Sequence, residues 1–119
     1  MNVAVIGASN NPERYSHQAV TLLAQNGHTP YPVHPSLDSV AGHRAYPSIG
    51  AITAKIDAVT VYLSPRNQHT LGADILASNA PRVIFNPGAE NPPLAAALRQ
   101  AGVDVVEACT LVMLRTGQF

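Results

Sequence analysis

The chain has 119 residues, enough for one domain that buries roughly two thirds of the surface exposed by its unfolded chain. Seven basic and seven acidic side chains cancel and only 5% of residues are aromatic, which excludes a charged, stacking surface for nucleic acid. A single cysteine excludes a disulfide framework and is typical of a reducing compartment. No apolar run approaches the roughly 20 residues that cross a membrane, and the first strand starts too early for a signal peptide. We therefore expect a cytoplasmic, single-domain protein.

The first predicted elements are a buried strand and a helix. Residues 3–6 form an apolar run without alternation, as in a strand covered on both faces. A helix is predicted over residues 16–26, because Val20 and Leu23 recur at helical spacing. Gly27 suits the left-handed position that follows a helix.

A second strand is predicted over residues 29–33, although Pro30 and Pro32 both lack a backbone N–H. Because the two prolines are two residues apart, their backbone groups point to the same side of the strand. Tyr31 can hydrogen-bond to a neighbouring strand on the other side. We expect this strand to be hydrogen-bonded mainly on one side.

The middle of the chain, residues 35–55, is the irregular part. It is predicted to contain at most a short strand near residues 44–46 and a helical turn near Ser48. Residues 58–63 then restore a buried strand of apolar and β-branched side chains.

Two further helices are predicted from cap-plus-proline starts. Ser64 followed by Pro65 indicates the first, with Leu71 and Ile75 on one face, and a strand over residues 82–85 comes after it. The second start is Asn91-Pro92 and its end is Gly102. The apolar stripe of this second helix is expected to be Leu94, Leu98 and Ala101. Residues 103–106 close the sheet, and residues 111–114 form a last short element.

Alternation of strands and helices predicts parallel strands joined by right-handed crossovers. About five parallel strands with helices on both faces make a Rossmann-like α/β fold, residues 1–119 being one domain. Ligands of such sheets bind beyond the carboxyl ends of the strands. The loops placed there are residues 7–14, 34–36, 64–67, 86–91 and 107–110.

The first of these loops is the best predicted anion site. Ser9, Asn10 and Asn11 offer polar side chains, the helix N-terminus adds a positive field, and Arg14 adds a full charge. The alternative is that Gly7 only permits a tight turn and that Arg14 is solvated.

Two features argue against a nicotinamide cofactor. The G-x-G-x-x-G fingerprint is incomplete, because Gly7 is present but Ser9 and Pro12 fill the later positions. At the end of the second strand His34 stands where an acidic residue would bind the ribose, and Asp38 is a weak substitute.

Six ordered blocks then carry a resemblance over nearly the whole chain. They are V-A-V-I-G-A-S-x-N-P-x-R (3–14), P-V-H-P (32–35), G-H-R-A-Y-P-S-I (42–49), I-D-A-V-T-V-Y (56–62), N-P-G-A-E-N (86–91) and A-G-V-D-V-V-E-A-C (101–109). The chain resembles the small CoA-binding proteins of bacteria and archaea. Their fold matches the CoA-binding domain of the succinyl-CoA synthetase α subunit.

The resemblance implies that CoA or an acyl-CoA lies along the strand ends. The nucleotide phosphates would meet the first loop, the adenosine would lie at the end of the second strand, and the pantetheine would pass the end of the third. The residues expected to bind the cofactor are Gly7, Ala8, Ser9, Asn10, Pro12, Arg14, Val33, His34, Pro35, Leu63, Ser64, Pro65, Asn86 and Gly88.

The chain departs from the family pattern at three positions. His34 replaces a typical asparagine, which could change the adenosine contact or its pH dependence. Asn86 replaces a usual glutamine and Ile84 a usual tryptophan, so the role of that loop is open. The second domain of the synthetase is missing, and no synthetase activity is inferred.

We expect no catalytic residue and no metal site. Cys109 could be a nucleophile or pair with the CoA thiol, but a cysteine after a buried strand is more often a small core residue. Glu90, beside a helix start, is expected to act as a dipole partner. Tyr46 is expected to lie nearer the ligand than Tyr62.

The preferred hypothesis is a non-catalytic module that binds CoA or acyl-CoA, with no nucleic acid or membrane partner. The alternatives are a minimal NAD(P)-binding oxidoreductase, a thiol-dependent enzyme that modifies CoA through Cys109, and an interaction-only protein. Residues 111–114 could form a homodimer or protein-partner contact, or they could cover the sheet. The acyl group and the pathway stay open.

Overall fold

The computed structural model describes residues 1–119 and has one parallel sheet with the strand order β2-β1-β5-β6-β7. Its strands are β1 (Asn2–Ile6), β2 (Thr29–Val33), β5 (Ala58–Val61), β6 (Arg82–Phe85) and β7 (Asp104–Glu107). A second, two-stranded antiparallel sheet consists of β3 (Ser39–Val40) and β4 (His43–Arg44). The predicted Rossmann-like α/β fold is therefore confirmed.

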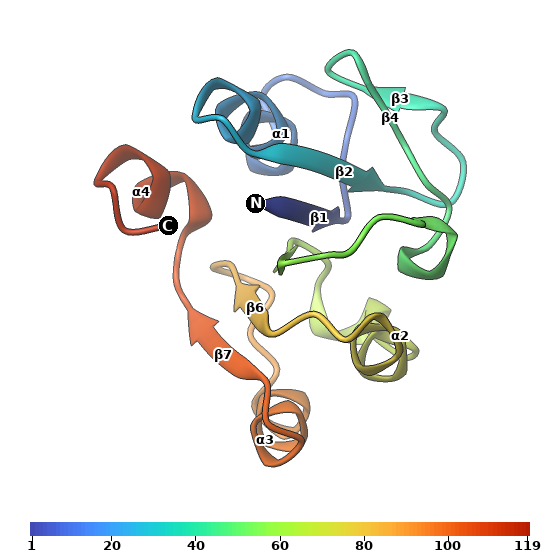
Figure 1. Cartoon of the computed structure of the whole chain (residues 1–119), viewed down its shortest axis with the longest axis vertical. Helices are drawn as coiled ribbons and strands as arrows, with labels where there is room; N and C mark the ends of the chain where they lie inside the picture. The colour runs from blue at the N-terminus through green and yellow to red at the C-terminus, as the bar shows by residue number, and fades with distance from the viewer.

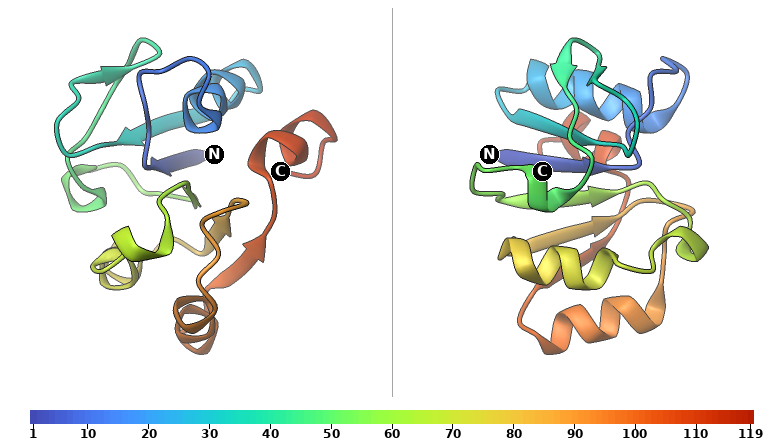
Figure 2. Two further views of the ribbon diagram at one scale, coloured as in Figure 1. Left: turned by 180° about the vertical axis from the view of Figure 1, so that it is seen from behind. Right: turned by 90° about the vertical axis from the view of Figure 1, so that its right-hand side faces the viewer.

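Helices cover both faces of the parallel sheet (Figures 1 and 2). They are α1 (Tyr15–Gln25), α2 (Leu71–Ser78), α3 (Pro92–Gln100) and α4 (Thr110–Arg115), with 3-10 turns η1 (Ile49–Ala51) and η2 (Pro65–Asn67). Leu23 of α1 and Leu114 of α4 belong to one buried cluster, whereas Ile75 of α2 and Leu98 of α3 belong to another. Each face of the sheet thus has its own apolar core. None of the helices is both long and apolar enough to span a membrane.

The two prolines of β2 explain why this strand lies at the edge of the sheet. The N–H of Thr29 donates to the carbonyl of Met1 at 2.9 Å, so alternate residues of β2 face β1. Pro30 and Pro32 therefore face the open edge, where no N–H is needed. The carbonyl of Pro32 accepts there from the N–H of Tyr46 at 2.9 Å. The predicted one-sided bonding of β2 is confirmed.

The predicted helix start at Ser64 is wrong. Ser64 precedes only the short turn η2 and makes no capping bond, and α2 begins seven residues later, at Leu71. The reason is Gln68, whose buried side chain turns inward and donates from Nε2 to the carbonyls of Leu63 and Ala89, both at 2.9 Å. These two bonds stop the chain from continuing as one helix.

The second cap-plus-proline start is confirmed, but its predicted stripe needs a correction. Oδ1 of Asn91 accepts the N–H of Leu94, and α3 follows directly. Ala101 is exposed because the helix has ended there, and the buried residues of α3 are Ala95 and Leu98.

The last predicted element is helix α4, and it covers the sheet. Leu111 and Leu114 are buried, whereas Val112 is 53% exposed. Of the two alternatives for this segment, packing against the sheet is the one observed.

Candidate functional site

The strand order reverses between β1 and β5, and two cavities open at the carboxyl ends of these strands. Both cavities touch Gly7, the residue that follows β1. Gly7 has a φ of +83°, and a Cβ there would lie 3.2 Å from the backbone nitrogen of Leu63. A glycine is therefore required for the ends of β1 and β5 to approach each other this closely.

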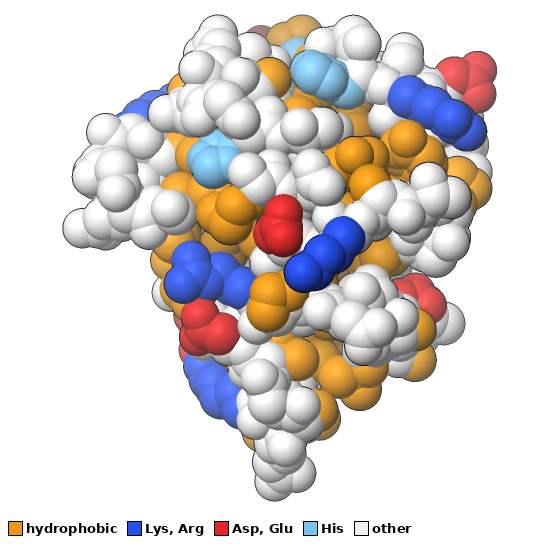
Figure 3. Space-filling view, in the orientation of Figure 1, with side chains coloured by type: hydrophobic (Ala, Val, Ile, Leu, Met, Phe, Trp, Pro, Cys, Tyr) orange, Lys and Arg blue, Asp and Glu red, His pale blue; other side chains and the backbone are white.

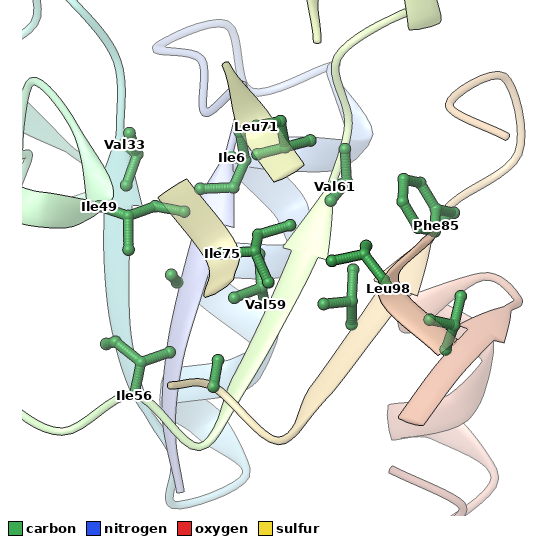
Figure 4. Packing of buried hydrophobic residues seen from close by; sticks show 14 of the residues in the cluster. Ile6, Val33, Ile49, Ile56, Val59, Val61, Leu71, Ile75, Phe85 and Leu98 are labelled. Carbon is green, nitrogen blue, oxygen red and sulfur yellow. The ribbon is translucent and has the colours of Figure 1, made fainter. Parts of the chain in front are cut away.

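The first cavity, which we call the β2-side cavity, has a volume of about 380 Å³. Its floor is apolar: Ile6, Val33, Ile49 and Leu71 lie together at the carboxyl end of the strands, at the opposite end of the cluster from Ile56 (Figure 4). Other lining residues are His34, Pro35, Leu63, Asn67, Thr70 and Asp74. An apolar slot with a few polar groups at its wall suits a flat heterocycle such as adenine.

The second cavity, which we call the α1-side cavity, has a volume of about 450 Å³ and a more polar lining. It includes Ser9, Glu13, Arg14, Tyr15, Ser16, Tyr62 and Pro87. The predicted phosphate loop and the N-terminus of α1 therefore border one cavity.

The first loop uses side-chain acceptors to make its turn. Oγ of Ser9 accepts the N–H of Asn11 at 3.0 Å, and Oδ1 of Asn11 accepts the N–H of Glu13 at 3.0 Å. The hydroxyl proton of Ser9 stays available as a donor. Asn10 and Pro12 are exposed and line neither cavity, and Ala8 is buried beneath the loop.

The N-terminus of α1 has no capping side chain and no acidic residue in its first turn. The backbone N–H groups of Tyr15, Ser16 and His17 have no acceptor within the protein. The only ion pair joins Arg82 to Asp104, so the exposed guanidinium of Arg14 is unpaired. Free amides, a helix dipole and a free cation make this the part of the molecule best suited to a phosphate.

Basic and acidic side chains alternate over the face drawn in Figure 3 instead of gathering into a patch of one sign. At the first loop Glu13 lines the same cavity as Arg14, so the free amides of α1, and not a net charge, distinguish this end of the sheet.

Asp74 is a residue that the sequence analysis missed. It belongs to the first turn of α2 and lines the β2-side cavity, where its Oδ2 accepts the hydroxyl of Thr70 at 3.2 Å. The strand β2 ends without a carboxylate, but a neighbouring element supplies one. The sequence analysis considered only the residue at the end of β2 and so did not predict this carboxylate. The signal that could have found Asp74 is its place one turn after a helix start at the strand ends.

The fourth loop is held by its own side chains. Asn86 is buried; its Nδ2 donates to Oγ1 of Thr60 at 2.7 Å and to the carbonyl of Val61 at 2.9 Å. Both donors of Asn86 are used inside the protein, so they are not available to a ligand. The exposed Gly88 donates its N–H to Glu90 at 2.6 Å, so Glu90 caps this loop.

Tyr62, not Tyr46, borders the site, which corrects the expected order. The ring of Tyr46 packs at a tilt of 46° against Tyr31, with 5.8 Å between the ring centres, and Tyr46 lines neither cavity. Burial raises the pKa of Tyr62 to about 12, and the neighbouring hydroxyls of Thr110 and Thr60 offset only part of this shift. Those two hydroxyls bond to each other at 2.7 Å, and the Tyr62 hydroxyl itself makes no hydrogen bond.

The other chemistry-bearing residues lie apart. Cys109 is half-buried and precedes α4, without a capping bond. Ser64 accepts at Oγ from Nδ2 of Asn67 at 3.1 Å, and Pro65 is exposed beside it. No three histidine, cysteine or acidic side chains converge in a geometry that could hold a metal ion.

The chain is similar to several known proteins. The family model described as "CoA binding domain" matches residues 1–115. The uncharacterized protein YneT of Bacillus subtilis (strain 168) is 28% identical over 104 residues, which are 87% of this chain and 77% of that protein.

Two solved structures show the same architecture. A crystal structure of an uncharacterized protein is 35% identical, with a TM-score of 0.87 over 99% of this chain and 97% of the other. The dinucleotide forming acetyl-coenzyme A synthetase 1 of Ca. Korarchaeum cryptofilum, solved with phosphate and ADP, has a TM-score of 0.77 at 20% identity. It aligns with 90% of this chain over 25% of its own length. The second likeness concerns the fold alone.

Proposed function

Because this chain belongs to the CoA binding domain family, we propose that it binds coenzyme A or an acyl-CoA across the carboxyl ends of its parallel strands. The protein acts as a binding module and the ligand is a small nucleotide. A cytoplasmic setting is part of the proposal, since the free Cys109 suits a reducing compartment.

The observation that carries the proposal is the pairing of an anion-binding loop with an adjoining apolar slot. The free amides of α1 and the unpaired Arg14 border one cavity, and Gly7 joins that cavity to the other. A pyrophosphate over Gly7 would leave the adenosine on the β2 side, above Val33. The chain of the pantetheine would then run past Tyr62 and Pro87 toward the end of β6.

This arrangement supports two of the three expected contact groups, those for the phosphates and for the adenosine. Gly7, Ser9 and Arg14 line the α1-side cavity, whereas Val33, His34, Pro35 and Leu63 line the β2-side cavity. The amide of Gly88 would become available only if Glu90 released it.

A calorimetric titration with CoA, dephospho-CoA, NAD and NADP tests the proposal. We expect CoA or its dephosphorylated form to bind most tightly. The strongest response to NAD, or no response to any of the four, would overturn it.

NAD is a second candidate because of one observation. Asp74 lines the β2-side cavity, and its carboxylate could accept from ribose hydroxyls. If NAD is the ligand, the unmodified protein should bind NAD more tightly than the other three nucleotides. The variant Asp74→Asn should then bind NAD more weakly than the unmodified protein does. If CoA is the ligand, NAD should have the lowest affinity of the four nucleotides in the same titrations.

A further inference from the structure

The end of β2 carries a histidine whose ring is fixed on one side by the backbone. Nδ1 of His34 accepts the N–H of Ser36 at 3.0 Å and the N–H of Leu37 at 3.2 Å. The Ser36 hydroxyl also lies 3.3 Å from Nδ1. A nitrogen that accepts two N–H donors carries no proton, so the neutral ring holds its proton on Nε2.

The second ring nitrogen is left for a ligand. Nε2 of His34 has no hydrogen-bond partner in the protein, and His34 lines the β2-side cavity. The ring therefore offers one N–H donor whose identity is set by the turn behind it. Nδ1 of His34 accepts the backbone N–H groups of the turn, as the side-chain oxygen of asparagine does in an Asx turn. The imidazole adds a donor, Nε2–H, at a position that the shorter asparagine side chain does not reach.

A charged residue on another element lines the same cavity as His34. Asp74 lies one turn into α2, and its Oδ2 is bonded to Thr70. His34 instead directly follows β2. The donor of the cavity is thus at the strand end and the acceptor is on the opposing helix.

The end of the second strand is where folds of this kind read the ribose of an adenine nucleotide. In nicotinamide-binding folds a carboxylate at this position binds the ribose hydroxyls, whereas an arginine nearby accommodates a phosphate on the ribose. The Nε2–H of His34 is the hydrogen-bond donor at that place in this protein. We propose that Nε2–H of His34 donates to a phosphate on the adenosine ribose, so that the site prefers a 3′-phosphorylated adenine nucleotide over its dephosphorylated form. This inference rests on the proposed function and names its specificity-determining residue.

The test compares the affinities of CoA and dephospho-CoA in the full chain. The unmodified protein should bind CoA at least about tenfold more tightly, as expected for one hydrogen bond to a charged group. In His34→Asn the side-chain oxygen can still accept from Ser36 and Leu37, but the shorter side chain places no donor at the position of Nε2, so the ratio of the two affinities should fall toward one. His34→Gln places an amide N–H near the position of Nε2 and should keep part of the ratio.

Ser36→Ala is the matched control, because it removes the hydroxyl beside Nδ1 and keeps the backbone donor. This variant should preserve the ratio of the unmodified protein. Nitrogen-15 spectra of the ring give a readout independent of binding, and they should show Nδ1 without a proton and Nε2 with one.

The outcomes separate this inference from the proposed function. Equal affinity for the two nucleotides in the unmodified protein, an unchanged ratio in His34→Asn, or a proton on Nδ1 would overturn the inference alone. Failure to bind either nucleotide would overturn the proposed function and this inference with it.

Discussion

The backbone N–H of Thr110 donates to Oδ1 of Asn86 at 2.8 Å, which joins the start of α4 to the end of β6. The same asparagine donates to Thr60 and Val61 of β5, and Thr60 and Thr110 share a hydroxyl bond. Three segments that are distant in sequence therefore meet at one buried side chain directly beneath the strand ends.

Replacing Asn86 with alanine should destabilise the fold by about 2–4 kcal/mol, because it leaves the buried backbone N–H of Thr110 without an acceptor and removes the donor to Thr60 and Val61. Urea unfolding followed by circular dichroism measures the change. Asn10→Ala is the control, since Asn10 is exposed, and it should stay within about 0.5 kcal/mol of the unmodified protein. Similar losses in the two variants would contradict this role of Asn86.

Gly7→Ala should both destabilise the protein, by about 1–3 kcal/mol, and weaken nucleotide binding. The new Cβ meets Leu63 at 3.1–3.3 Å in a left-handed backbone conformation, so the junction of the two cavities must shift. Gly102→Ala separates the two effects, because Gly102 has a φ of +91° but nothing within 4 Å of an added Cβ. It should lose stability and retain CoA affinity, as measured by thermal melts and calorimetry.

Arg14→Ala should weaken CoA binding by about 1.5–3 kcal/mol, if the guanidinium makes a charge-assisted bond to a phosphate. Arg82→Ala removes the same charge at the amino end of β6 and should keep the affinity. Arg14→Lys should recover part of the loss. Calorimetry at two salt concentrations checks the origin of the effect, because an electrostatic contribution decreases as salt rises. An unchanged affinity in Arg14→Ala would mean that the amides of α1 and Ser9 suffice.

Tyr62→Phe should make the protein less sensitive to alkali. The folded protein holds the Tyr62 proton up to about pH 12, whereas the unfolded chain releases it near pH 10. The stability that the folded protein gains by holding this proton more tightly than the unfolded chain is fully present below pH 10, and it is lost as the pH rises toward 12. Unfolding at pH 8 and pH 11 should therefore show a smaller decrease for Tyr62→Phe. The variant should be at least as stable at pH 8, because it removes a buried hydroxyl that has no partner. An equal decrease in both proteins would contradict the assignment.

Local features of the sequence determined the strands and their parallel arrangement, and they indicated which loops lie at the strand ends. Pro30 and Pro32 placed β2 at the edge because two missing N–H groups of one phase can only face an open side. Asn91 and Pro92 marked a helix start because cap chemistry acts within one turn. The first loop could be chosen from its residues alone, since the ends of parallel strands share one edge.

Ser64 and Pro65 carry the same local signal as Asn91 and Pro92, yet no α-helix begins there. The difference is that Gln68 makes bonds to Leu63 and to the distant Ala89, and a pattern read over one turn contains nothing about that contact. Propensity yields to tertiary hydrogen bonds of this kind.

The sequence by itself determined where each strand ends to within two residues, and so which loops follow the strand ends. Only the tertiary structure decided which side chains face that site: it brought Asp74 into the cavity from α2, withdrew Asn86 into the interior and placed Tyr62 instead of Tyr46 at the wall. The physical reason is that strands and turns depend on neighbours within a few residues, whereas the walls of a cavity depend on how helices pack across the sheet.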